Sequence, residues 1–409
     1  MSRLEELIQQ YCPDGVENKK LGDVVSISRG ASPRPIQNYL TNDEDGIPWI
    51  KIGDVSTNSK YITSTAERIT REGANKSRFL KKGTFILSNS MSFGRPYILG
   101  IDGCIHDGWI SICDFEASLN SDFLYYLLRC SNVQGYWISK ANSGGAVANL
   151  NSDIVRSTPI PVPPLPVQEE IVRILDTFTE LQAELQAELQ KRLQQYNYYR
   201  DNLLSFEGRT DVEWKKLGDV ATDWYRGAGI KRDEVSEEGI PCIRYGEIHT
   251  TYNIWFNECI SHTDENKQPA KKYADYGDIL FAITSEDIPF IGNSVAYIGK
   301  ERILVGGDIV VMKHTQNPKY MSYALSSSDA VMQKGKGKVK SKVVHTSVPS
   351  LKEIVVPIPS LEEQEKIASI LDRFYTLTTD ITAGLPAEIE ARRKQYEYYR
   401  DKLLTFKKK

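Results

Sequence analysis

The sequence lacks the features of secreted, membrane-spanning and disulfide-stabilised proteins. Its six cysteines show neither CxxC spacing nor the density of a disulfide framework, which favours reduced, mostly buried thiols over metal ligands. No run of about 18 apolar residues occurs, and the N-terminal MSRLEELIQQY has no signal-peptide apolar region. We therefore expect a cytoplasmic protein that is neither secreted nor embedded in a membrane.

Catalytic motifs are also missing. The chain has no GxxxxGK[ST] phosphate loop, no strand–GxGxxG–helix unit, no HExxH and no [DNS]PP[YFW] tetrapeptide of adenine methyltransferases. Ordinary surface or core roles are favoured for the five scattered histidines, His106, His249, His262, His314 and His345. We interpret the chain as non-catalytic, because a free-standing DNA methyltransferase or nuclease needs motifs that are absent here.

Neither sign of charge dominates. The formal net charge is −3, from 51 Lys and Arg against 54 Asp and Glu. This balance creates no global attraction to nucleic acid, so any basic binding surface must be local. The 409 residues suffice for about two to three domains, and 40% hydrophobic residues allow each a real core.

What the chain does contain is an internal repeat. QYNYYRDNLLSF at 195–206 returns as QYEYYRDKLLTF at 395–406, and LPVQEEIVRILDTFTEL from Leu165 matches LEEQEKIASILDRFYTL from Leu361. The hexapeptide KKLGDV occurs at 19–24 and again at 215–220. Repeats of this length indicate an architecture made of copied units.

Apolar residues at steps of three and four predict two long amphipathic helices with narrow apolar seams, over 161–207 and 359–409. Gly384 and Pro386 should break or kink the second helix. Because only short linkers join the segments, the second helix must run back along the first, and the two seams should form an antiparallel coiled coil. The first seam runs through Ile171, Ile174, Phe178, Leu181, Leu185, Leu189, Tyr196, Leu203 and Phe206.

The segments before each helix predict mixed domains of short strands. IPWIKIGDV from Ile47 matches IPCIRYGEI from Ile240, and helices are expected near Ser121 and Pro318. The predicted fold class is α+β: two mixed α/β domains separated by two long helices in an antiparallel coiled coil, with pseudo-twofold symmetry. The predicted boundaries are 1–160 and 208–358 for the domains, and 161–207 and 359–409 for the helices.

These residues resemble a known family. The long helices with EEIVRILDTFTEL, the repeated QYNYYRDNLLSF stretch and the paired KKLGDV starts are similar to the specificity (HsdS) subunit of type I restriction–modification systems. The similarity is closest to the type IC-like group with tetrapeptide repeats in the central helix, and it covers essentially the whole chain. In that family the two mixed domains are target-recognition domains.

The resemblance implies a subunit that binds double-stranded DNA without activity of its own. It implies assembly with two methyltransferase subunits and, for cleavage, with restriction subunits. S-adenosylmethionine, ATP and Mg²⁺ are then implied only for those partners, and no cofactor or metal is expected on this chain. Each domain is expected to recognise one half of an asymmetric bipartite target, because the two copies diverge in their loops. A coiled-coil scaffold without sequence-specific DNA binding is the alternative.

The tetrapeptides FTEL, QAEL and QAEL occupy 178–189. Each four-residue unit lengthens a helix by about 6 Å and turns it about 40° beyond a full turn, so adding or removing one shifts a domain by about one to two base pairs. The alternative interpretation is that the tetrapeptides are simply good helix-forming sequence with Leu on the seam. It is compatible with the spacer role.

DNA contacts need Lys, Arg or small polar side chains for phosphates, and forked donors or amides for base edges. A solvated loop remains the alternative for each candidate. Trp49 and Trp255 are expected in the core. The first-domain candidates are Arg29, Ser32, Arg34, Lys51, Asn89, Ser90, Ser92 and Arg95. Those of the second are Tyr225, Arg226, Lys231, Arg232, Arg244, Tyr245, Ser285 and a flexible cationic strip containing Lys334, Lys336, Lys338 and Lys340.

The near-identity of the repeated QY-YYRD stretches predicts a second kind of surface. A symmetric pair of methyltransferase docking sites would require the same residues in both copies. The candidates for partner binding are Tyr198, Arg200, Tyr398 and Arg400.

Overall fold

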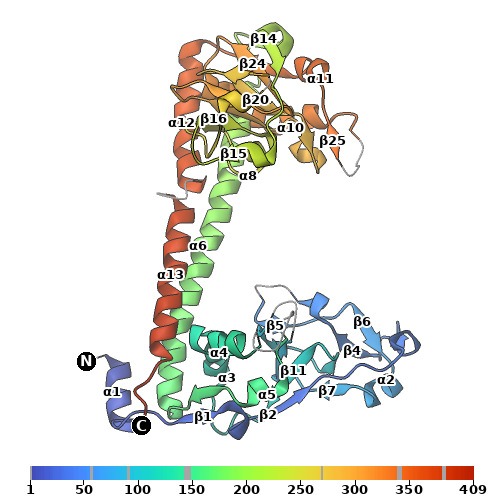
Figure 1. Ribbon diagram of the computed structural model, residues 1–409, viewed down its shortest axis with the longest axis vertical. Coiled ribbons are helices and arrows are strands. Elements are labelled where there is room, and N and C mark those ends of the chain that lie inside the picture. Colours follow the sequence, from blue (N-terminus) through green and yellow to red (C-terminus); the bar gives the residue numbers. More distant parts are fainter. Residues whose placement is uncertain are drawn as a thin grey trace. The chain divides into compact units, whose positions relative to one another are not determined.

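The computed structural model describes residues 2–55, 59–89, 93–141, 149–268, 270–338, 343–379 and 384–409. The chain divides into two compact units (Figure 1). Unit 1 comprises Met1–Glu184 and Ile389–Lys409, and unit 2 comprises Leu185–Glu388. Each unit therefore contains one mixed domain together with part of each long helical segment.

Unit 1 is built on two five-stranded sheets, with strand orders β2-β11-β8-β9-β5 and β3-β6-β4-β10-β7, and on the pair β1-β12. Most neighbours are antiparallel, but β10 with β4 and β5 with β9 are parallel. The strands are β1 (Asn18–Lys20), β2 (Ser26–Arg29), β3 (Leu40–Thr41), β4 (Ile47–Ile50), β5 (Tyr61–Ile62), β6 (Glu67–Ile69), β7 (Arg78–Leu80), β8 (Phe85–Ser88), β9 (Pro96–Leu99), β10 (Gly103–Ile105), β11 (Trp109–Cys113) and β12 (Pro159–Pro161). The helices are α1 (Arg3–Tyr11), α2 (Arg71–Asn75), α3 (Ser121–Arg129), α4 (Ser131–Ala141) and α5 (Ser152–Arg156), with short turns η1 (Leu21–Asp23), η2 (Ile36–Asn38) and η3 (Ile52–Asp54).

Unit 2 repeats this topology strand for strand. Its sheets have the orders β14-β24-β20-β22-β17 and β15-β18-β16-β23-β19, with the pair β13-β26 and an additional pair β21-β25. The strands are β13 (Glu213–Lys216), β14 (Ala221–Arg226), β15 (Val235–Ser236), β16 (Ile240–Ile243), β17 (Trp255–Phe256), β18 (Ser261–Thr263), β19 (Tyr273–Ala274), β20 (Ile279–Ala282), β21 (Thr284–Ser285), β22 (Ser294–Tyr297), β23 (Ile303–Val305), β24 (Ile309–His314), β25 (Val344–His345) and β26 (Val355–Ile358). The helices are α7 (Leu217–Val220), α8 (Tyr245–Thr250), α9 (Pro318–Ser326), α10 (Ser328–Gly335) and α11 (Val348–Lys352), with turns η5 (Arg232–Glu234), η6 (Glu265–Lys267) and η7 (Ile288–Phe290).

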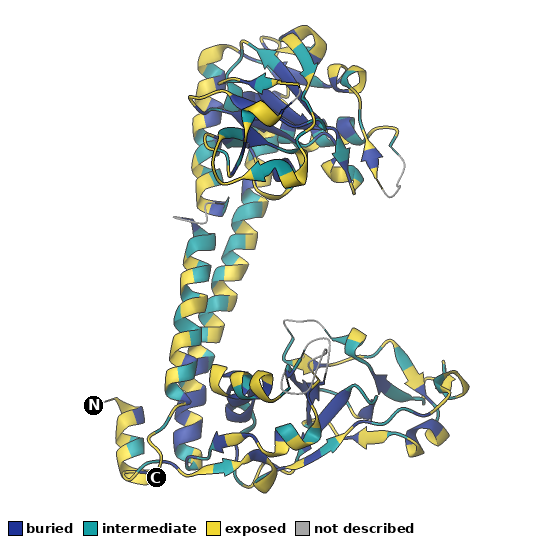
Figure 2. Ribbon diagram, viewed as in Figure 1, coloured by how far each residue is buried: buried dark blue, intermediate teal, exposed yellow. Residues whose placement is uncertain are grey.

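The central strands are short apolar runs because both of their faces are covered. All four residues of β8, FILS, and of β20, ILFA, are buried. Figure 2 shows these strands inside each unit, with exposed residues concentrated on helices and connections. The segments that contain them, KKGTFILSNS from Lys81 and YGDILFAITS from Tyr276, thus occupy the same buried position in two copies of one sheet.

A buried glutamine ties each domain to the start of its long helix. Gln168 Oε1 accepts from the backbone N–H of Asn120 at 2.8 Å, and Gln364 Oε1 accepts from that of Asn317 at 3.0 Å. Each glutamine Nε2 also donates to the carbonyl of a preceding proline, at 2.7 and 2.9 Å. Asn120 and Asn317 in turn cap the first turns of α3 and α9. The domain therefore determines the position at which its helix begins.

The long helices form as the apolar period predicts. α6 is continuous from Leu165 to Ser205, whereas the second segment consists of α12 (Leu361–Thr379) and α13 (Leu385–Leu403). The predicted break near Gly384 and Pro386 is confirmed, since the helix ends at Thr379 and a new one begins beside these residues; positions 380–383 lie outside the described residues. Proline fits at the first turn of α13 because the N–H it lacks would have no helical partner there.

The long helices run antiparallel within each unit (Figure 1), and an aromatic pair joins them in both units. In unit 1, Phe178 of α6 stacks on Tyr399 of α13 with ring centroids 5.5 Å apart. In unit 2, Tyr199 of α6 stacks on Phe374 of α12 at 5.3 Å. These four residues are the same two repeat positions used in both units, so the coiled coil and its internal symmetry are as predicted.

The ends of the seams join the domain cores. Tyr196 and Leu204 of α6 belong to one cluster of unit 2 together with Ile367 and Leu371 of α12. The repeated stretch of α6 therefore packs near the start of the opposite helix in this unit. This packing also explains why each compact unit includes helical residues: the helix faces complete the core of the domain.

Three further findings concern the cysteines, the length of the helices and possible metal ligands. All six cysteines are free thiols, and four of them, Cys12, Cys104, Cys130 and Cys242, are buried. Among the described residues, no helix is both long and apolar enough to cross a membrane. Within the same residues, no cluster of three or more His, Cys, Asp or Glu side chains could hold a metal ion.

Candidate nucleic-acid interface

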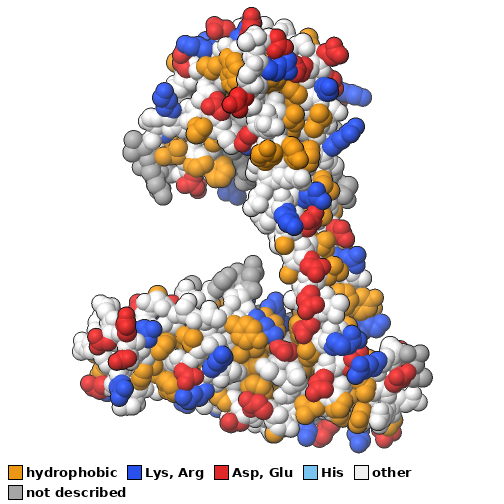
Figure 3. All heavy atoms as spheres, turned by 180° about the vertical axis from the view of Figure 1, so that it is seen from behind, with side chains coloured by type: hydrophobic (Ala, Val, Ile, Leu, Met, Phe, Trp, Pro, Cys, Tyr) orange, Lys and Arg blue, Asp and Glu red, His pale blue; other side chains and the backbone are white. Residues whose placement is uncertain are grey.

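On the face drawn in Figure 3, charge of both signs is interspersed rather than gathered. Figure 3 shows Lys and Arg side chains alternating with Asp and Glu over the face in view. A candidate interface therefore has to be found from the local geometry of individual side chains. Two hollows, one in each unit, contain most of the well-placed candidates.

The hollow of unit 1 is organised by the turn after β2. The backbone N–H of Gly30 donates to Trp109 O at 2.8 Å, and that of Ala31 donates to Ile105 O at 3.3 Å, so the turn lies against the connection between β10 and β11. A Cβ at Gly30 would overlap the carbonyl oxygen of His106. Only glycine allows this close backbone approach.

The same turn is present after β14 in unit 2. The N–H of Gly227 donates to Ile309 O at 2.9 Å, and that of Ala228 donates to Val305 O at 2.9 Å. A Cβ at Gly227 would overlap the carbonyl oxygen of Gly306. The glycine of the Arg-Gly-Ala sequence is thus required twice, because the same turn packs on a neighbouring strand connection in both units.

An arginine precedes each of these glycines and is held in the same way. Arg29 Nε donates to Asp107 O at 3.0 Å, and Arg226 Nε donates to Gly307 O. Arg226 also forms an ion pair with Asp308, Nη2 to Oδ1 at 2.7 Å. Among the described residues, no acceptor is bonded to the terminal nitrogens of Arg29. Each guanidinium that lines a hollow is therefore positioned through Nε, and that of Arg226 is held through Nη2 as well.

A second basic residue lines each hollow at the start of a short helical turn. The Lys51 backbone N–H donates to Asp54 Oδ2 at 2.8 Å, and the Arg244 backbone N–H donates to Glu247 Oε2 at 3.1 Å. This is half of a capping box, and it explains why an acid follows the basic residue by three positions in both copies. The basic side chains remain partly exposed, at 34% for Lys51 and 31% for Arg244.

The hollows differ in size and in part of their lining. The unit 1 hollow, of about 540 Å³, is lined by Arg29, Lys51, Ile52, Gly53, Asn89, His106, Asp107, Gly108 and Asn149. The unit 2 hollow, of about 760 Å³, is lined by Arg226, Gly229, Ile230, Arg232, Arg244, Tyr245, Gly246, Glu247, Thr250, Gly306, Gly307 and Asp308.

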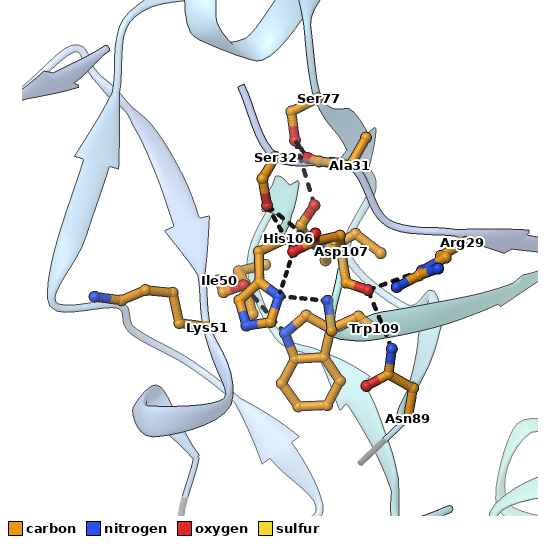
Figure 4. A network of polar contacts seen from close by, with 12 residues as sticks. Arg29, Ala31, Ser32, Ile50, Lys51, Ser77, Asn89, His106, Asp107 and Trp109 are labelled. Carbon is orange, nitrogen blue, oxygen red and sulfur yellow. Dashed lines mark hydrogen bonds and ion pairs between the residues drawn. The ribbon is translucent and has the colours of Figure 1, made fainter. Parts of the chain in front are cut away.

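His106 was not among the sequence candidates, yet it lines the unit 1 hollow. The backbone N–H of Gly108 donates to its Nδ1, and its ring centroid lies 6.3 Å from those of both Trp49 and Trp109. Figure 4 shows His106 beside Trp109 and Asp107. Burial lowers the pKa of His106 below its usual value. The imidazole is therefore neutral near pH 7. The signal that could have identified it is its position immediately before the Asp107–Gly108 turn that receives Arg29.

At the same turn, three more of the predicted residues donate hydrogen bonds to Asp107. Ser32 Oγ donates to Asp107 Oδ1 at 2.9 Å, and Arg34 Nη2 donates to Oδ2 at 3.0 Å. Burial alone would raise the pKa of Asp107, but these hydrogen bonds lower it. Asn89 Nδ2 donates to the Asp107 carbonyl at 3.1 Å, and its side chain is buried. Asn89 and Ser32 thus shape the turn, whereas Arg34 is 81% exposed.

Other candidates lie apart from the hollows or cannot be placed. Arg95 is half-buried just before β9, and Tyr225 donates its hydroxyl to Tyr273 O beneath the second sheet. Lys231 is 77% exposed beside the η5 turn, next to Arg232, which lines the unit 2 hollow. Ser90, Ser92 and Lys340 lie outside the described residues.

Two sequence predictions in unit 2 are wrong. Lys334 belongs to α10, not to a flexible strip: its side chain is buried, and Nζ donates to the Leu325 carbonyl at 2.8 Å, at the end of α9. Burial lowers the pKa of Lys334 to about 7. Ser285 is also buried, with Oγ donating to Asp287 O at 3.0 Å in a local turn. Neither side chain is available to a phosphate.

The remainder of the predicted strip begins after α10. Lys336 is exposed, and Lys338 Nζ donates to His345 O at 2.8 Å. Trp49 is buried, as expected. Trp255 is half-buried against α12, with Nε1 donating to Asp372 Oδ1 at 2.9 Å, so it too packs within its unit.

The repeated QY-YYRD stretch has a structural role in each unit. Asp201 Oδ1 accepts from the backbone N–H of Ser328 at 3.1 Å, and Asp401 Oδ1 accepts from that of Ser131 at 3.1 Å. These bonds satisfy the first amides of α10 and α4. The near-identity of the two copies is therefore required in part by the fold itself.

The four predicted partner-binding residues separate into two groups. The side chains of Arg200 and Arg400 are only 11% and 10% exposed, and each pairs with the following aspartate, at 2.9 and 2.8 Å. Tyr198 and Tyr398, in contrast, are 66% and 61% exposed. The tyrosines are thus the members of this set that present a large apolar surface to solvent.

Comparisons with known proteins agree on one family. A model of the type I restriction modification DNA specificity domain matches residues 13–195 and again residues 210–391. The specificity subunit of the type I restriction enzymes EcoR124I and EcoR124II of Escherichia coli is 33% identical over 415 residues, covering 91% of this chain and 98% of the relative. A putative type I restriction enzyme specificity subunit of Haemophilus influenzae is 32% identical and covers 73% of this chain and 75% of its own length.

A solved structure shows the same fold. It comes from a study of complex assembly and conformational transition of the type I R-M system, and it has a TM-score of 0.65. The alignment covers 96% of this chain and 98% of the other at 17% identity.

Proposed function

The chain belongs to the type I restriction–modification DNA specificity family, and from that premise we propose that each unit binds one half of an asymmetric bipartite DNA target through its hollow. The protein is a sequence-specific DNA-recognition subunit. The observation that carries the proposal is the repetition of one arrangement. An arginine held through Nε and a basic residue at a capped turn, Arg29 with Lys51 and Arg226 with Arg244, line equivalent hollows.

This arrangement suits duplex DNA. A guanidinium anchored through Nε can direct its terminal nitrogens at phosphate oxygens, or at the O6 and N7 of guanine in the major groove. Lys51 and Arg244 add a second cation a short distance away, and Arg34 and Lys231 are exposed cations on the neighbouring loops. Two acids of the hollows are bonded to cations: Asp107 accepts from Arg34, and Asp308 pairs with Arg226.

The partners follow from the family. A type I specificity subunit acts on DNA within an assembly of methyltransferase and restriction subunits. For this chain, the proposal is two methyltransferase subunits that dock near Tyr198 and Tyr398, with Arg200 and Arg400 supporting those surfaces from within. Restriction subunits join the cleaving complex. The chain itself is non-catalytic in this proposal, acts in the cytoplasm and leaves S-adenosylmethionine, ATP and Mg²⁺ to its partners.

The long helices set the spacer of the proposed target. α6 is continuous through the tetrapeptides at 178–189, so each unit of four residues adds about 6 Å of helix. This length corresponds to about two base pairs of duplex.

The test is methylome sequencing of cells that carry this chain with its cognate methyltransferase. A bipartite N6-methyladenine motif with an unspecified spacer is expected. Cells with the methyltransferase alone are the control and should lack that motif. A continuous motif, or a motif that persists without this chain, would contradict the proposal. The same outcomes separate it from a coiled-coil scaffold, which would not change methylation at any sequence.

A further inference from the structure

The two hollows can be compared position by position because their strands have the same register. Ile50 of β4 pairs with Ile105 of β10, and Ile243 of β16 pairs with Val305 of β23, in parallel. The residues that follow these pairs are therefore equivalent. Lys51 corresponds to Arg244, and His106 corresponds to Gly306.

This comparison separates the lining residues that the two hollows share from those that differ between them. The anchored arginine, the basic residue at the capped turn, and Gly53 with its equivalent Gly246 are of the same type in both hollows. Several lining positions differ in chemistry, and at two of them only one hollow has a ring. His106 stands where unit 2 has Gly306, and Tyr245 stands where unit 1 has Ile52.

We propose that His106 in unit 1 and Tyr245 in unit 2 are specificity-determining residues that contact base edges, while the shared cations hold the DNA backbone. The inference rests on the proposed function and goes beyond it by assigning two residues to two different half-sites. Contacts to phosphate carry no sequence information, so a basic residue common to both copies serves affinity. Two half-sites that differ in sequence need side chains that differ between the copies.

His106 has the geometry of a fixed hydrogen-bond donor. Its Nδ1 accepts from the Gly108 N–H, so the proton of the neutral ring is on Nε2. Among the described residues no acceptor is bonded to Nε2, and the side chain is 21% exposed, at the wall of the hollow. Trp49 and Trp109 lie beside the ring and restrict its rotation. A single oriented N–H matches the acceptors N7 and O6 of guanine, N7 of adenine or O4 of thymine.

Tyr245 provides a different chemistry in unit 2. It is the first residue of α8, it is 40% exposed, and its ring meets that of His249 edge-on at 6.3 Å. The unit 2 hollow is the larger of the two, at about 760 Å³ against about 540 Å³, and Gly306 and Gly307 in its lining have no side chains. The Tyr245 side chain can therefore reach a base through its hydroxyl or cover a thymine methyl with its ring face.

The test uses the whole subunit assembled with its methyltransferase, and the variants His106→Asn and Tyr245→Ile. Asparagine can still accept from the Gly108 N–H through Oδ1, but it has no donor at the Nε2 position. Isoleucine is the residue found at the equivalent position of unit 1. Methylome sequencing is expected to show His106→Asn relaxing one base position in one half-site only, with discrimination reduced about tenfold. Tyr245→Ile is expected to relax one position in the other half-site only.

Each outcome decides something. A wild-type motif that is not bipartite overturns the proposed function. A bipartite wild-type motif left unchanged by both variants overturns only the assignment of the two residues. Lower methylation at the unchanged motif would mean a positioning role and also refutes the assignment. Thermal unfolding of each complex identifies a folding defect. His106→Gln then serves as the second variant, because its amide reaches towards the position of Nε2 and should restore part of the discrimination.

Discussion

The replacement Gly30→Ala tests the packing that creates the unit 1 hollow. The added methyl would overlap the His106 carbonyl oxygen and lie 2.8 Å from its carbonyl carbon and 3.1 Å from Ile105 O. All three are backbone atoms in the connection between β10 and β11, so no side chain can rotate away. The turn after β2 must therefore move outward, and Arg29 must move with it.

The expected cost follows from the hydrogen bonds of the turn. Moving it breaks the bonds from the Gly30 and Ala31 amides to Trp109 O and Ile105 O, now 2.8 and 3.3 Å long. Each buried N–H left without a partner costs about 1–3 kcal/mol, so the local loss is about 2–6 kcal/mol. Because Nε of Arg29 loses its fixed relation to Asp107 O, methylation at the bipartite motif should also fall.

Hydrogen–deuterium exchange of the assembled complex measures this loss locally, which suits a chain of two units better than one global unfolding transition. The amides at the end of β2 and in β11 should exchange faster by a factor of about 30 or more. Gly53→Ala is the matched control, because a Cβ at Gly53 meets nothing within 4 Å although the residue lines the same hollow. Equal exchange in Gly30→Ala and Gly53→Ala would refute the reasoning.

Two further predictions concern the helix and a buried histidine. Deleting Gln186 to Leu189 should leave both half-sites intact and shorten the spacer by about one to two base pairs, as methylome sequencing will show; a changed half-site would contradict the spacer argument. His314 Nδ1 accepts from the Gln316 N–H at 3.0 Å, and burial lowers its pKa from 6.5 to about 4, so the folded state resists a proton that the unfolded state accepts. The free energy of unfolding should therefore fall by about 2 kcal/mol between pH 7 and pH 5. This fall should be absent in His314→Asn, which keeps an acceptor for the Gln316 N–H. The test is urea denaturation of the whole chain at pH 7 and pH 5, with the unfolding of unit 2 monitored by hydrogen exchange. An equal pH effect in wild type and variant would refute the prediction.

The elements predicted correctly are those with a strong local signal. The seam of α6, the break before α13 and the helices α3 and α9 depend on periodicity, on Gly384 with Pro386 and on capping asparagines, all of which lie within a few residues of the elements they define. The strand order could not be predicted in this way. Pairing of β4 with β10 joins residues more than 50 positions apart, and it depends on burial of both faces rather than on local propensity.

The candidate site likewise contains residues that the sequence revealed and residues that only tertiary contacts reveal. Arg29, Arg226, Lys51 and Arg244 were recognisable because Lys and Arg are the side chains that phosphate and base-edge contacts need. His106 was missed because its donor geometry depends on a turn amide and on tryptophans from other strands. Lys334 was misplaced because its alternation with glycine resembles a loop, whereas its helix directs it towards the last carbonyls of α9.

By itself the sequence determined the duplication, the two long helices, the family and the residue types available for binding DNA, because these depend on local pattern and on similarity between the copies. Only the tertiary structure decided which cations line a hollow and which are buried and bonded to other groups of the protein. Burial and hydrogen-bond satisfaction are properties of the packed chain. A lysine such as Lys334 or an arginine such as Arg200 is identical in sequence to an exposed one until its neighbours are in place.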